Sequence, residues 1–370
     1  MNSKELIIAS LEGKPVDRMP VTASYAFLYQ QDHFAELTGK ANWELHRWLS
    51  SEPEDYLSIY HDMTTRAPFD IVEPQGVSCK HFEFVRKDGH MCLHDRRTDT
   101  YKPIDLKSSG EHPLDYTANE TRRIFDRDDV RKQVPIVKAE AWPGNDHVEA
   151  VVRRYGKEHF LMAYMTGILW SCHWHLGQSN MLCMLIEEPD LIRYLSDRLL
   201  ENTIEAIRAQ CALGYDGIFI DDAMAYSDII SVRHYEQFSL PYLKTMVDEV
   251  HRLGRKAILI YFGGVSDRLE QIVATGADGL MVETSMKNYV NDIVQIAGQI
   301  GERITLFGNI DPVRVLQDGT DGQLEDELRR QAQAARKSRG FIMSTGSPIT
   351  PRTPLDRVRK FIELSRKLKV

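Results

Sequence analysis

Two carboxylic acids end short apolar runs in the second half of the chain. Asp221 ends the run that begins at Gly217, and Glu283 ends the run that begins at Gly279, so each acid stands four residues after its glycine. A carboxyl group in an apolar pocket has a raised pKa and can act as a general acid near neutral pH. We therefore predict that Asp221 and Glu283 are catalytic residues that face each other across one site. The alternative is that either acid caps a helix or pairs with an arginine.

Other polar side chains stand at the ends of similar runs. Tyr261 offers a phenol that can donate a hydrogen bond or stack on an aromatic substrate, and Asn309 offers an amide. We predict both as catalytic residues, with packing in the rim as the alternative for Tyr261. Asp222 follows Asp221 and points the opposite way if the strand continues. We include Asp222 among the substrate-binding residues, with a structural role as the alternative.

Acids and aromatic side chains elsewhere are candidates for binding a substrate. Glu73 ends a short apolar run, and Tyr25 and Trp170 lie at the ends of two others. His173 forms a His-x-His pair with His175, and such side chains share a face on a strand but not on a helix. The pair could ligate a metal, and packing among the neighbouring tryptophans is the alternative. We predict Tyr25, Glu73, Trp170 and His173 as substrate-binding residues, and the metal ligands stay unknown.

A repeated alternation of strands and helices must position these residues. Runs that are apolar on both faces are typical of parallel strands covered by helices. The expected strands are residues 21–25, 70–74, 160–167, 217–222, 257–261, 279–284, 304–311 and 341–347. They predict the α/β class and a single (β/α)8 TIM barrel over residues 1–370, whose active site lies at the carboxyl ends of the strands.

An insertion interrupts the barrel pattern at about residues 80–150. The segments His81–Val85 and His90–Leu93 flank an Asp-Gly pair, which predicts a β-hairpin. A polar helical stretch follows the hairpin, and we expect residues 108–115 to form a loop.

Composition excludes several classes of protein. The net charge of -8 argues against a general nucleic-acid binder, and the first ten residues are too polar for a signal peptide or a membrane span. The five cysteines show no zinc spacing, so we expect reduced thiols and a cytoplasmic protein. An oligomer is compatible with the sequence, which does not specify the oligomeric state.

Three motifs carry a resemblance to a known family. They are Glu12-Gly-Lys-Pro-Val-Asp-Arg-Met-Pro-Val21, Gly308-Asn-Ile-Asp-Pro312 and the segment 346–354, Gly-Ser-Pro-Ile-Thr-Pro-Arg-Thr-Pro. They resemble the opening, a strand end and the last strand of the uroporphyrinogen decarboxylase superfamily, which implies a TIM barrel. One branch of that superfamily decarboxylates uroporphyrinogen without a cofactor. The other moves methyl groups to or from a corrinoid, often with zinc.

The chain departs from both branches at positions that matter for chemistry. The decarboxylase has an Arg-Gln-Ala-Gly-Arg-Tyr segment whose arginines hold carboxylates, whereas residues 24–29 here contain no arginine. The zinc methyltransferases have His-x-Cys-Gly after strand five and a cysteine in strand eight, whereas residues 260–264 and Ser347 supply neither thiolate nor imidazole. Ser347 replaces the decarboxylase's histidine and is predicted to bind substrate. Zinc would need carboxylate or histidine ligands from elsewhere on the rim.

Three functional hypotheses follow. The leading one is a methyltransferase that moves a methyl group from a small methylated compound, such as an aromatic methyl ether, to the corrinoid (cobalamin) of a partner protein. The second is a decarboxylase or other lyase that acts on a smaller acid. The third is a binding barrel without catalysis, which the missing zinc ligands favour and the remaining acids oppose.

Overall fold

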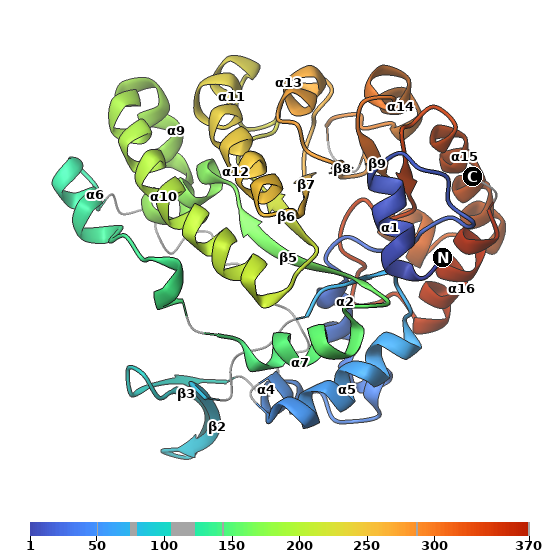
Figure 1. Ribbon diagram of the computed structural model, residues 1–370, viewed down its shortest axis with the longest axis horizontal. Helices are drawn as coiled ribbons and strands as arrows, with labels where there is room; N and C mark the ends of the chain where they lie inside the picture. Colours follow the sequence, from blue (N-terminus) through green and yellow to red (C-terminus); the bar gives the residue numbers. More distant parts are fainter. Residues whose placement is uncertain (50, 75–79, 105–122, 143, 286–287, 369–370) are drawn as a thin grey trace.

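The computed structural model describes residues 1–49, 51–74, 80–104, 123–142, 144–285 and 288–368. Seven parallel strands form one curved sheet (Figure 1). Their order is β1 (Ile71–Val72), β5 (Phe160–Thr166), β6 (Gly217–Asp221), β7 (Lys256–Tyr261), β8 (Gly279–Val282), β9 (Thr305–Phe307) and β10 (Phe341–Ile342). Because the order follows the chain and the strands are parallel, their carboxyl ends meet at one edge.

The expected first strand is present as a single bridge rather than as a strand. Val21 bridges to Met343 beside β10, and the Val21 carbonyl accepts a hydrogen bond from the Asp70 amide next to β1, with an N–O distance of 2.9 Å. The segment therefore closes the barrel between β10 and β1. Its pairing stops early because Pro20 has no amide proton and the Val21 amide bonds the Asp70 side chain at 2.8 Å.

Helices connect the strands and form the outer layer. They are α1 (Ser3–Leu11), α2 (Ala26–Asp32), α3 (Phe34–Thr38), α4 (Glu44–Leu49), α5 (Pro53–Arg66), α8 (Ile168–Leu176), α9 (Gln178–Glu187), α10 (Pro189–Leu213), α11 (Val232–Phe238), α12 (Leu240–Arg252), α13 (Leu269–Ala274), α14 (Ile293–Ile300), α15 (Asp321–Ala335) and α16 (Leu355–Lys367). Helix α1 is an exception, because its Ile7 and Leu11 pack with Phe160 and Phe219 inside the barrel. It closes the end at which the strands begin.

Two separate apolar clusters divide each strand into an inner and an outer face. Phe219 of β6 and Ile260 of β7 belong to the cluster inside the barrel, whereas Ile220 and Tyr261 belong to the cluster under the helices. Side chains alternate along a strand, so every second residue faces inward. This alternation decides which of the strand-end residues can meet in the mouth of the barrel.

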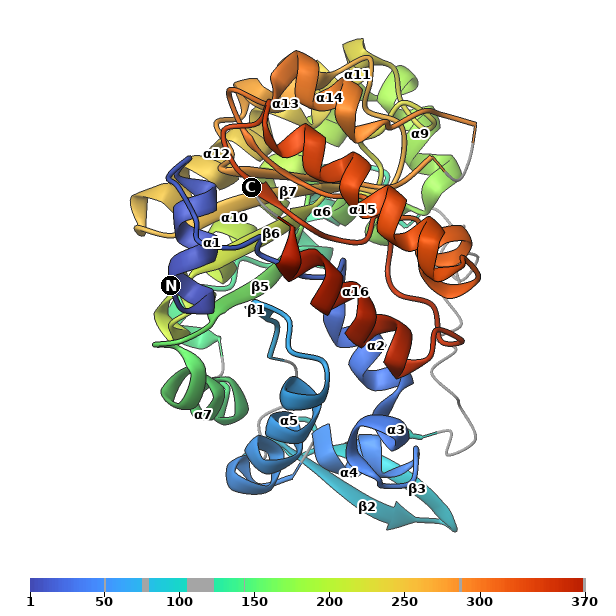
Figure 2. The ribbon, with the colours of Figure 1, turned by 90° about the vertical axis from the view of Figure 1, so that its right-hand side faces the viewer.

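The insertion contains the predicted hairpin and one further strand. Strands β2 (Phe82–Lys87), β3 (His90–Asp95) and β4 (Thr100–Pro103) form an antiparallel sheet, which lies beside α4 and away from the barrel strands (Figure 2). Asp88 and Gly89 have φ angles of 50° and 82°, as the tight turn requires. The helical stretch follows as α6 (Arg127–Gln133), a short 3-10 turn and α7 (Asp146–Tyr155), and the loop predicted at 108–115 lies outside the described residues.

Candidate active site at the strand ends

Acids and aromatic rings alternate around the inner face at the carboxyl ends of five neighbouring strands. Glu73 follows β1, Tyr164 lies on β5, Asp221 ends β6, Phe262 follows β7 and Glu283 follows β8. Tyr164 and Phe262 pack against the inner cluster, and each acid stands two residues beyond an inward-facing side chain. The mouth of the barrel therefore carries three acids separated by aromatic rings.

The structure places Asp221 at the carboxyl end of β6 and Glu283 directly after β8. Strand β7 lies between β6 and β8, so the two acids stand on next-but-one strands. Two strand spacings amount to about 10 Å. That the two acids face each other across one site stays a prediction.

Asp221 is a buried acid with one oxygen engaged. The Tyr25 hydroxyl donates a hydrogen bond to Oδ2, and Oδ1 has no hydrogen-bond partner within the described part of the chain. Only 2% of the residue is exposed. Burial raises the pKa of Asp221 to about 8, and the neighbouring Asp222 adds to the rise. Asp221 is therefore protonated at neutral pH and can give up a proton.

Glu73 is a second buried acid with one oxygen hydrogen-bonded and a raised pKa. Its Oε2 accepts a hydrogen bond from the Phe27 amide at 3.4 Å, near the start of α2, and its Oε1 has no partner among the described residues. Burial raises the pKa of Glu73 to about 8. The contact with α2 gives Glu73 a structural role beside any role in binding.

Tyr25 lies in a box of aromatic rings next to these acids. Its ring stacks on Tyr164 with centroids 4.5 Å apart, and it contacts Phe262 at 5.3 Å and Phe27 at 5.7 Å. Phe27 in turn meets Tyr164 edge-on at 5.5 Å. The predicted substrate-binding residue Tyr25 is thus brought together with Asp221 and the inner face of β5.

Asp222 points outward and holds the start of helix α8. Its Oδ1 accepts a hydrogen bond from the Trp170 amide at 2.8 Å, and its Oδ2 accepts one from the Ser239 hydroxyl at 2.8 Å. Gly167 permits this contact, because a Cβ there would lie 2.3 Å from the Asp222 Cβ. Burial raises the pKa of Asp222 to about 6. The structure supports the structural alternative for Asp222 over contact with a substrate.

Tyr261 also belongs to the outer layer. Its hydroxyl shares a hydrogen bond with the Tyr235 hydroxyl at an O–O distance of 2.8 Å, and 1% of the residue is exposed. The structure does not bring Tyr261 to Asp221, because the alternation of β7 turns Ile260 and Phe262 inward instead. Packing, the predicted alternative for Tyr261, describes its position.

Glu283 forms a second group with Tyr289, from the loop that follows β8, and with Ser347, which follows β10. Its carboxyl group accepts hydrogen bonds from the Tyr289 hydroxyl and, at 3.1 Å, from the Ser347 hydroxyl. Asn309 supports this group from behind, since its Nδ2 donates to the Asn291 carbonyl at 2.7 Å and the Asn291 Nδ2 donates to the Glu283 carbonyl at 2.9 Å. Ser347 therefore contacts a predicted catalytic acid, whereas Asn309 braces the loop that carries it.

Trp170 and His173 lie on helix α8. On a helix His173 and His175 do not share a face, so the predicted alternative of packing describes the pair better than metal ligation. His173 is 3% exposed, and burial lowers its pKa, so the imidazole is neutral. Its ring meets the Trp174 ring edge-on at 5.4 Å.

The donor set does not fit a metal in the described part of the chain. No group of three or more His, Cys, Asp or Glu side chains there is arranged to hold an ion. A zinc site needs three or four such ligands around one point. At residues 260–264 and at Ser347 the sequence also lacks the thiolates and imidazole that the zinc methyltransferases carry there.

Sequence reasoning missed several residues that shape the mouth. Tyr164 and Phe262 form two walls of the aromatic box, and Tyr289 and Asn291 hold Glu283. Tyr164 stands two residues after Met162 on a strand, so the alternation rule could have pointed to it. Tyr289 and Asn291 come from a loop, and a loop offers no periodic pattern from which to predict them.

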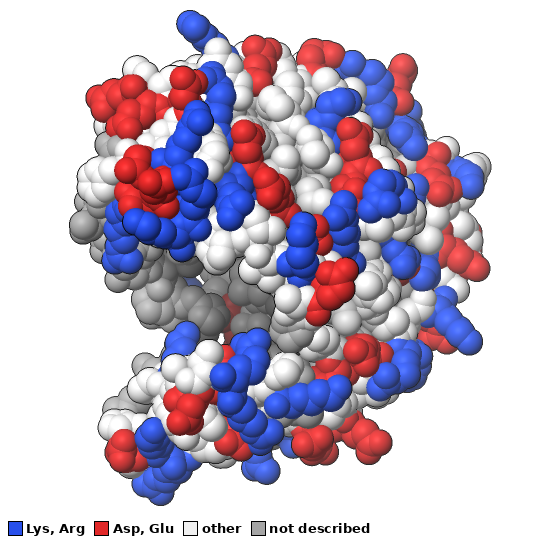
Figure 3. Space-filling view, turned by 60° about the vertical axis from the view of Figure 1, so that its left-hand side comes forward, with Lys and Arg blue, Asp and Glu red and all other residues white. Residues whose placement is uncertain are grey.

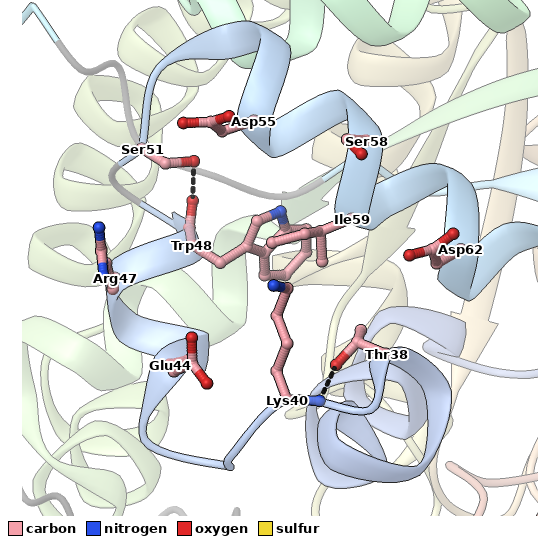
Figure 4. A pocket seen from close by; sticks show the side chains of 10 residues that line it. All are labelled: Thr38, Lys40, Glu44, Arg47, Trp48, Ser51, Asp55, Ser58, Ile59 and Asp62. Atoms are coloured by element: carbon pink, nitrogen blue, oxygen red, sulfur yellow. Dashed lines mark hydrogen bonds between the residues drawn. The ribbon is translucent and has the colours of Figure 1, made fainter.

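A separate pocket of about 390 Å³ lies between α3, α4 and α5, away from the mouth. Figure 4 shows its side chains of both charge signs arranged around Trp48, among them Lys40, Glu44, Arg47 and Asp62. None of the predicted site residues lines it.

Lys and Arg are interspersed with Asp and Glu over the face shown in Figure 3. Across the described residues, every helix is too short or too polar to span a bilayer.

The family of the chain follows from comparison with known proteins. The sequence profile described as uroporphyrinogen decarboxylase (URO-D) matches residues 112–368, more than half of the chain. The chain belongs to the uroporphyrinogen decarboxylase family. This membership confirms the resemblance carried by the three motifs.

Relatives in this family include enzymes of two kinds. A uroporphyrinogen decarboxylase from Coxiella burnetii is 30% identical over 205 residues, covering 52% of this chain and 53% of that protein. The methylcobamide:CoM methyltransferase MtbA from Methanosarcina mazei is 27% identical over 219 residues, covering 59% and 61%. The chain thus spans little more than half the length of these curated relatives in the matched regions.

A solved structure confirms the barrel. A methyltransferase from Methanosarcina mazei superposes with a TM-score of 0.70 over 99% of this chain and 98% of that chain, at 17% sequence identity. At this identity the likeness shows the fold and not the activity.

Proposed function

We propose that the chain transfers a methyl group from a small methylated compound, an aryl methyl ether in particular, to a corrinoid carried by a partner protein. The observation that carries the proposal is Asp221, a buried acid with a pKa of about 8 that lies beside an aromatic box. An aryl ether needs both features, because its ring stacks on aromatic side chains and its oxygen needs a proton to leave.

The corrinoid is a substrate of this reaction and supplies the electron pair that takes up the methyl group. The carbon–oxygen bond breaks, and the aryl oxygen keeps its electron pair. Asp221 then passes its proton to that oxygen, so a phenol leaves and a carboxylate stays behind. In the protein without substrate, the Tyr25 hydroxyl donates a hydrogen bond to this carboxyl group. Glu73, also protonated at neutral pH, adds no negative charge to oppose the ionisation of Asp221.

A substrate rich in carboxylates does not suit the described part of the mouth. Arg268 is the single buried Lys or Arg side chain among the described residues. Its guanidinium donates to the carbonyls of Ala225 and Ile230 at 2.7 and 2.8 Å and pairs with Asp267. Four of its five N–H donors are thereby engaged within the protein, so Arg268 is not set up to hold several substrate carboxylates, which supports an uncharged or phenolic substrate.

The test is methyl transfer from a panel of methoxylated benzenes to a reduced corrinoid protein, followed by the absorbance of the methylated corrinoid. We expect transfer by the natural protein and a loss of about 10²-fold or more in Asp221→Asn. Asp356→Asn makes the same chemical change at a residue whose side chain is 95% exposed, and it should keep full activity. No transfer across the panel would rule the proposal out.

A second candidate is decarboxylation of a smaller acid, supported by the uroporphyrinogen decarboxylases among the relatives. A protonated Asp221 could deliver its proton to the carbanion that forms when carbon dioxide leaves. Release of carbon dioxide from a small aromatic acid, lost in Asp221→Asn, would favour this candidate over methyl transfer.

A further inference from the structure

The ring of Tyr25 lies among three other aromatic rings beside Asp221. It is bounded by Tyr164, Phe262 and Phe27 at centroid distances of 4.5, 5.3 and 5.7 Å. Its hydroxyl donates to Oδ2 of Asp221, the acid that would protonate the substrate oxygen. The phenol side chain of Tyr25 thus has its ring in the aromatic box and its hydroxyl on Asp221.

The backbone of Tyr25 is in an unfavourable conformation. Its φ and ψ angles are 49° and 53°, which is the left-handed region that side chains with a Cβ rarely adopt. Such a conformation is strained and persists only when contacts hold it. Here the contacts are the stacked ring, the hydrogen bond to Asp221 and the bond from the neighbouring Ser24 amide to the Thr345 hydroxyl at 3.1 Å.

The acids behind Tyr25 retain unused hydrogen-bonding capacity. Oδ1 of Asp221 and Oε1 of Glu73 are buried and have no partner among the described residues. Buried polar atoms are nearly always paired, so unpaired ones at one place indicate a ligand that is absent. The Tyr25 side chain contacts both the acid and the box, since its hydroxyl bonds Asp221 and its ring lies against Tyr164, Phe262 and Phe27.

We propose that Tyr25 is a displaceable plug, whose ring and hydroxyl stand in for the ring and oxygen of the aromatic substrate until the substrate replaces them. The inference rests on the proposed function for the identity of the substrate, but plug displacement is a binding event that needs no corrinoid. Release of the left-handed backbone would favour the open state, whereas loss of the stacking and of the Asp221 contact opposes it. Tyr25 therefore sets the affinity of the mouth for an aromatic ligand and selects which rings can replace its own.

The test is equilibrium binding of guaiacol (2-methoxyphenol) and catechol by calorimetry, without a corrinoid protein. Tyr25→Phe keeps the ring and removes the hydrogen bond that holds the plug shut. We expect it to bind both phenols about tenfold more tightly than the natural protein, as the loss of one hydrogen bond from the closed state predicts. Tyr25→Gly, which also removes the ring and the backbone strain, should bind them at least as tightly as Tyr25→Phe.

Two controls make the result specific. Tyr29→Phe makes the same change in helix α2, which Tyr25 precedes, at a buried hydroxyl with no hydrogen-bond partner among the described residues, and it should bind like the natural protein. Cyclohexanol has a hydroxyl and a six-membered ring but no π face, and it should bind no better to the variants. Equal or weaker phenol binding by Tyr25→Phe and Tyr25→Gly would overturn the plug and make Tyr25 a fixed wall. If the variants bind phenols more tightly but no methyl transfer occurs, the plug stands and the proposed function fails.

Discussion

At the scale of single residues, two acids share one property through the same cause. Asp221 and Glu73 are each 2% exposed, and burial raises the pKa of each to about 8. Among the described residues, no lysine or arginine lowers the pKa of either acid, so burial is not offset by a cation. Both carboxyl groups in the mouth are therefore protonated at neutral pH.

This property links stability to pH. The folded protein keeps the Glu73 proton up to about pH 8, whereas the unfolded chain loses it near 4.5, the ordinary pKa of a glutamate. The contribution of this group to stability is therefore complete below about pH 4.5 and falls as pH rises towards 8, by on the order of 1 kcal/mol per pH unit. We predict that Glu73→Gln raises the melting temperature at pH 8 but not at pH 4.5. An equal shift at both pH values, measured by thermal unfolding, would contradict the raised pKa.

At the scale of elements, the start of helix α8 depends on one close contact. The Asp222 carboxyl group caps the helix only because Gly167 has no side chain, and a Cβ there would lie 2.3 Å from the Asp222 Cβ. We predict that Gly167→Ala lowers the free energy of unfolding by roughly 1–3 kcal/mol in urea. Gly298→Ala is the matched control, since nothing lies within 4 Å of its Cβ position in α14, and it should be neutral or stabilising. Equal stability of the two variants would contradict the role of this contact.

The elements also show where sequence reasoning succeeds. The strands that carry Asp221 and Glu283 were predictable, because buried parallel strands are apolar runs of recognisable length. The face of each strand was not, since β7 is apolar on both sides and its pattern does not say that Ile260 points inward and Tyr261 outward. The left-handed turn at Tyr25 depends on contacts with distant strands, so no local pattern predicts it.

At the scale of the whole molecule, one acid ties both ends of the chain to the barrel. Asp70 accepts hydrogen bonds from Ser3, from Arg18 and from Arg366 of the last helix. Burial opposes its ionisation, but the hydrogen bonds from Arg18 and Ser3 outweigh burial and lower the pKa of Asp70. The closure of the barrel between β10 and β1 passes through this residue, since it also binds the Val21 amide.

Removal of that charge should weaken the closed barrel. We predict that Asp70→Asn lowers the free energy of unfolding by roughly 2–4 kcal/mol, because the two arginines lose their buried partner. Urea unfolding at pH 7 measures the loss, with the exposed Asp356→Asn as the control that should change little. The difference between the variants should shrink as pH falls below the ordinary pKa of an aspartate. A difference that stays the same at low pH would contradict the charge-based account.

The most direct test of the central claim is the pH dependence of methyl transfer in a single turnover, from a methoxylated benzene to a reduced corrinoid protein. If protonated Asp221 is the general acid, the rate is constant at neutral pH and falls as pH rises through about 8. Asp221→Asn should lose that fall together with about 10²-fold or more of the rate. A natural protein whose rate does not change between pH 6 and 9, or a variant as fast as the natural protein, would contradict the assignment.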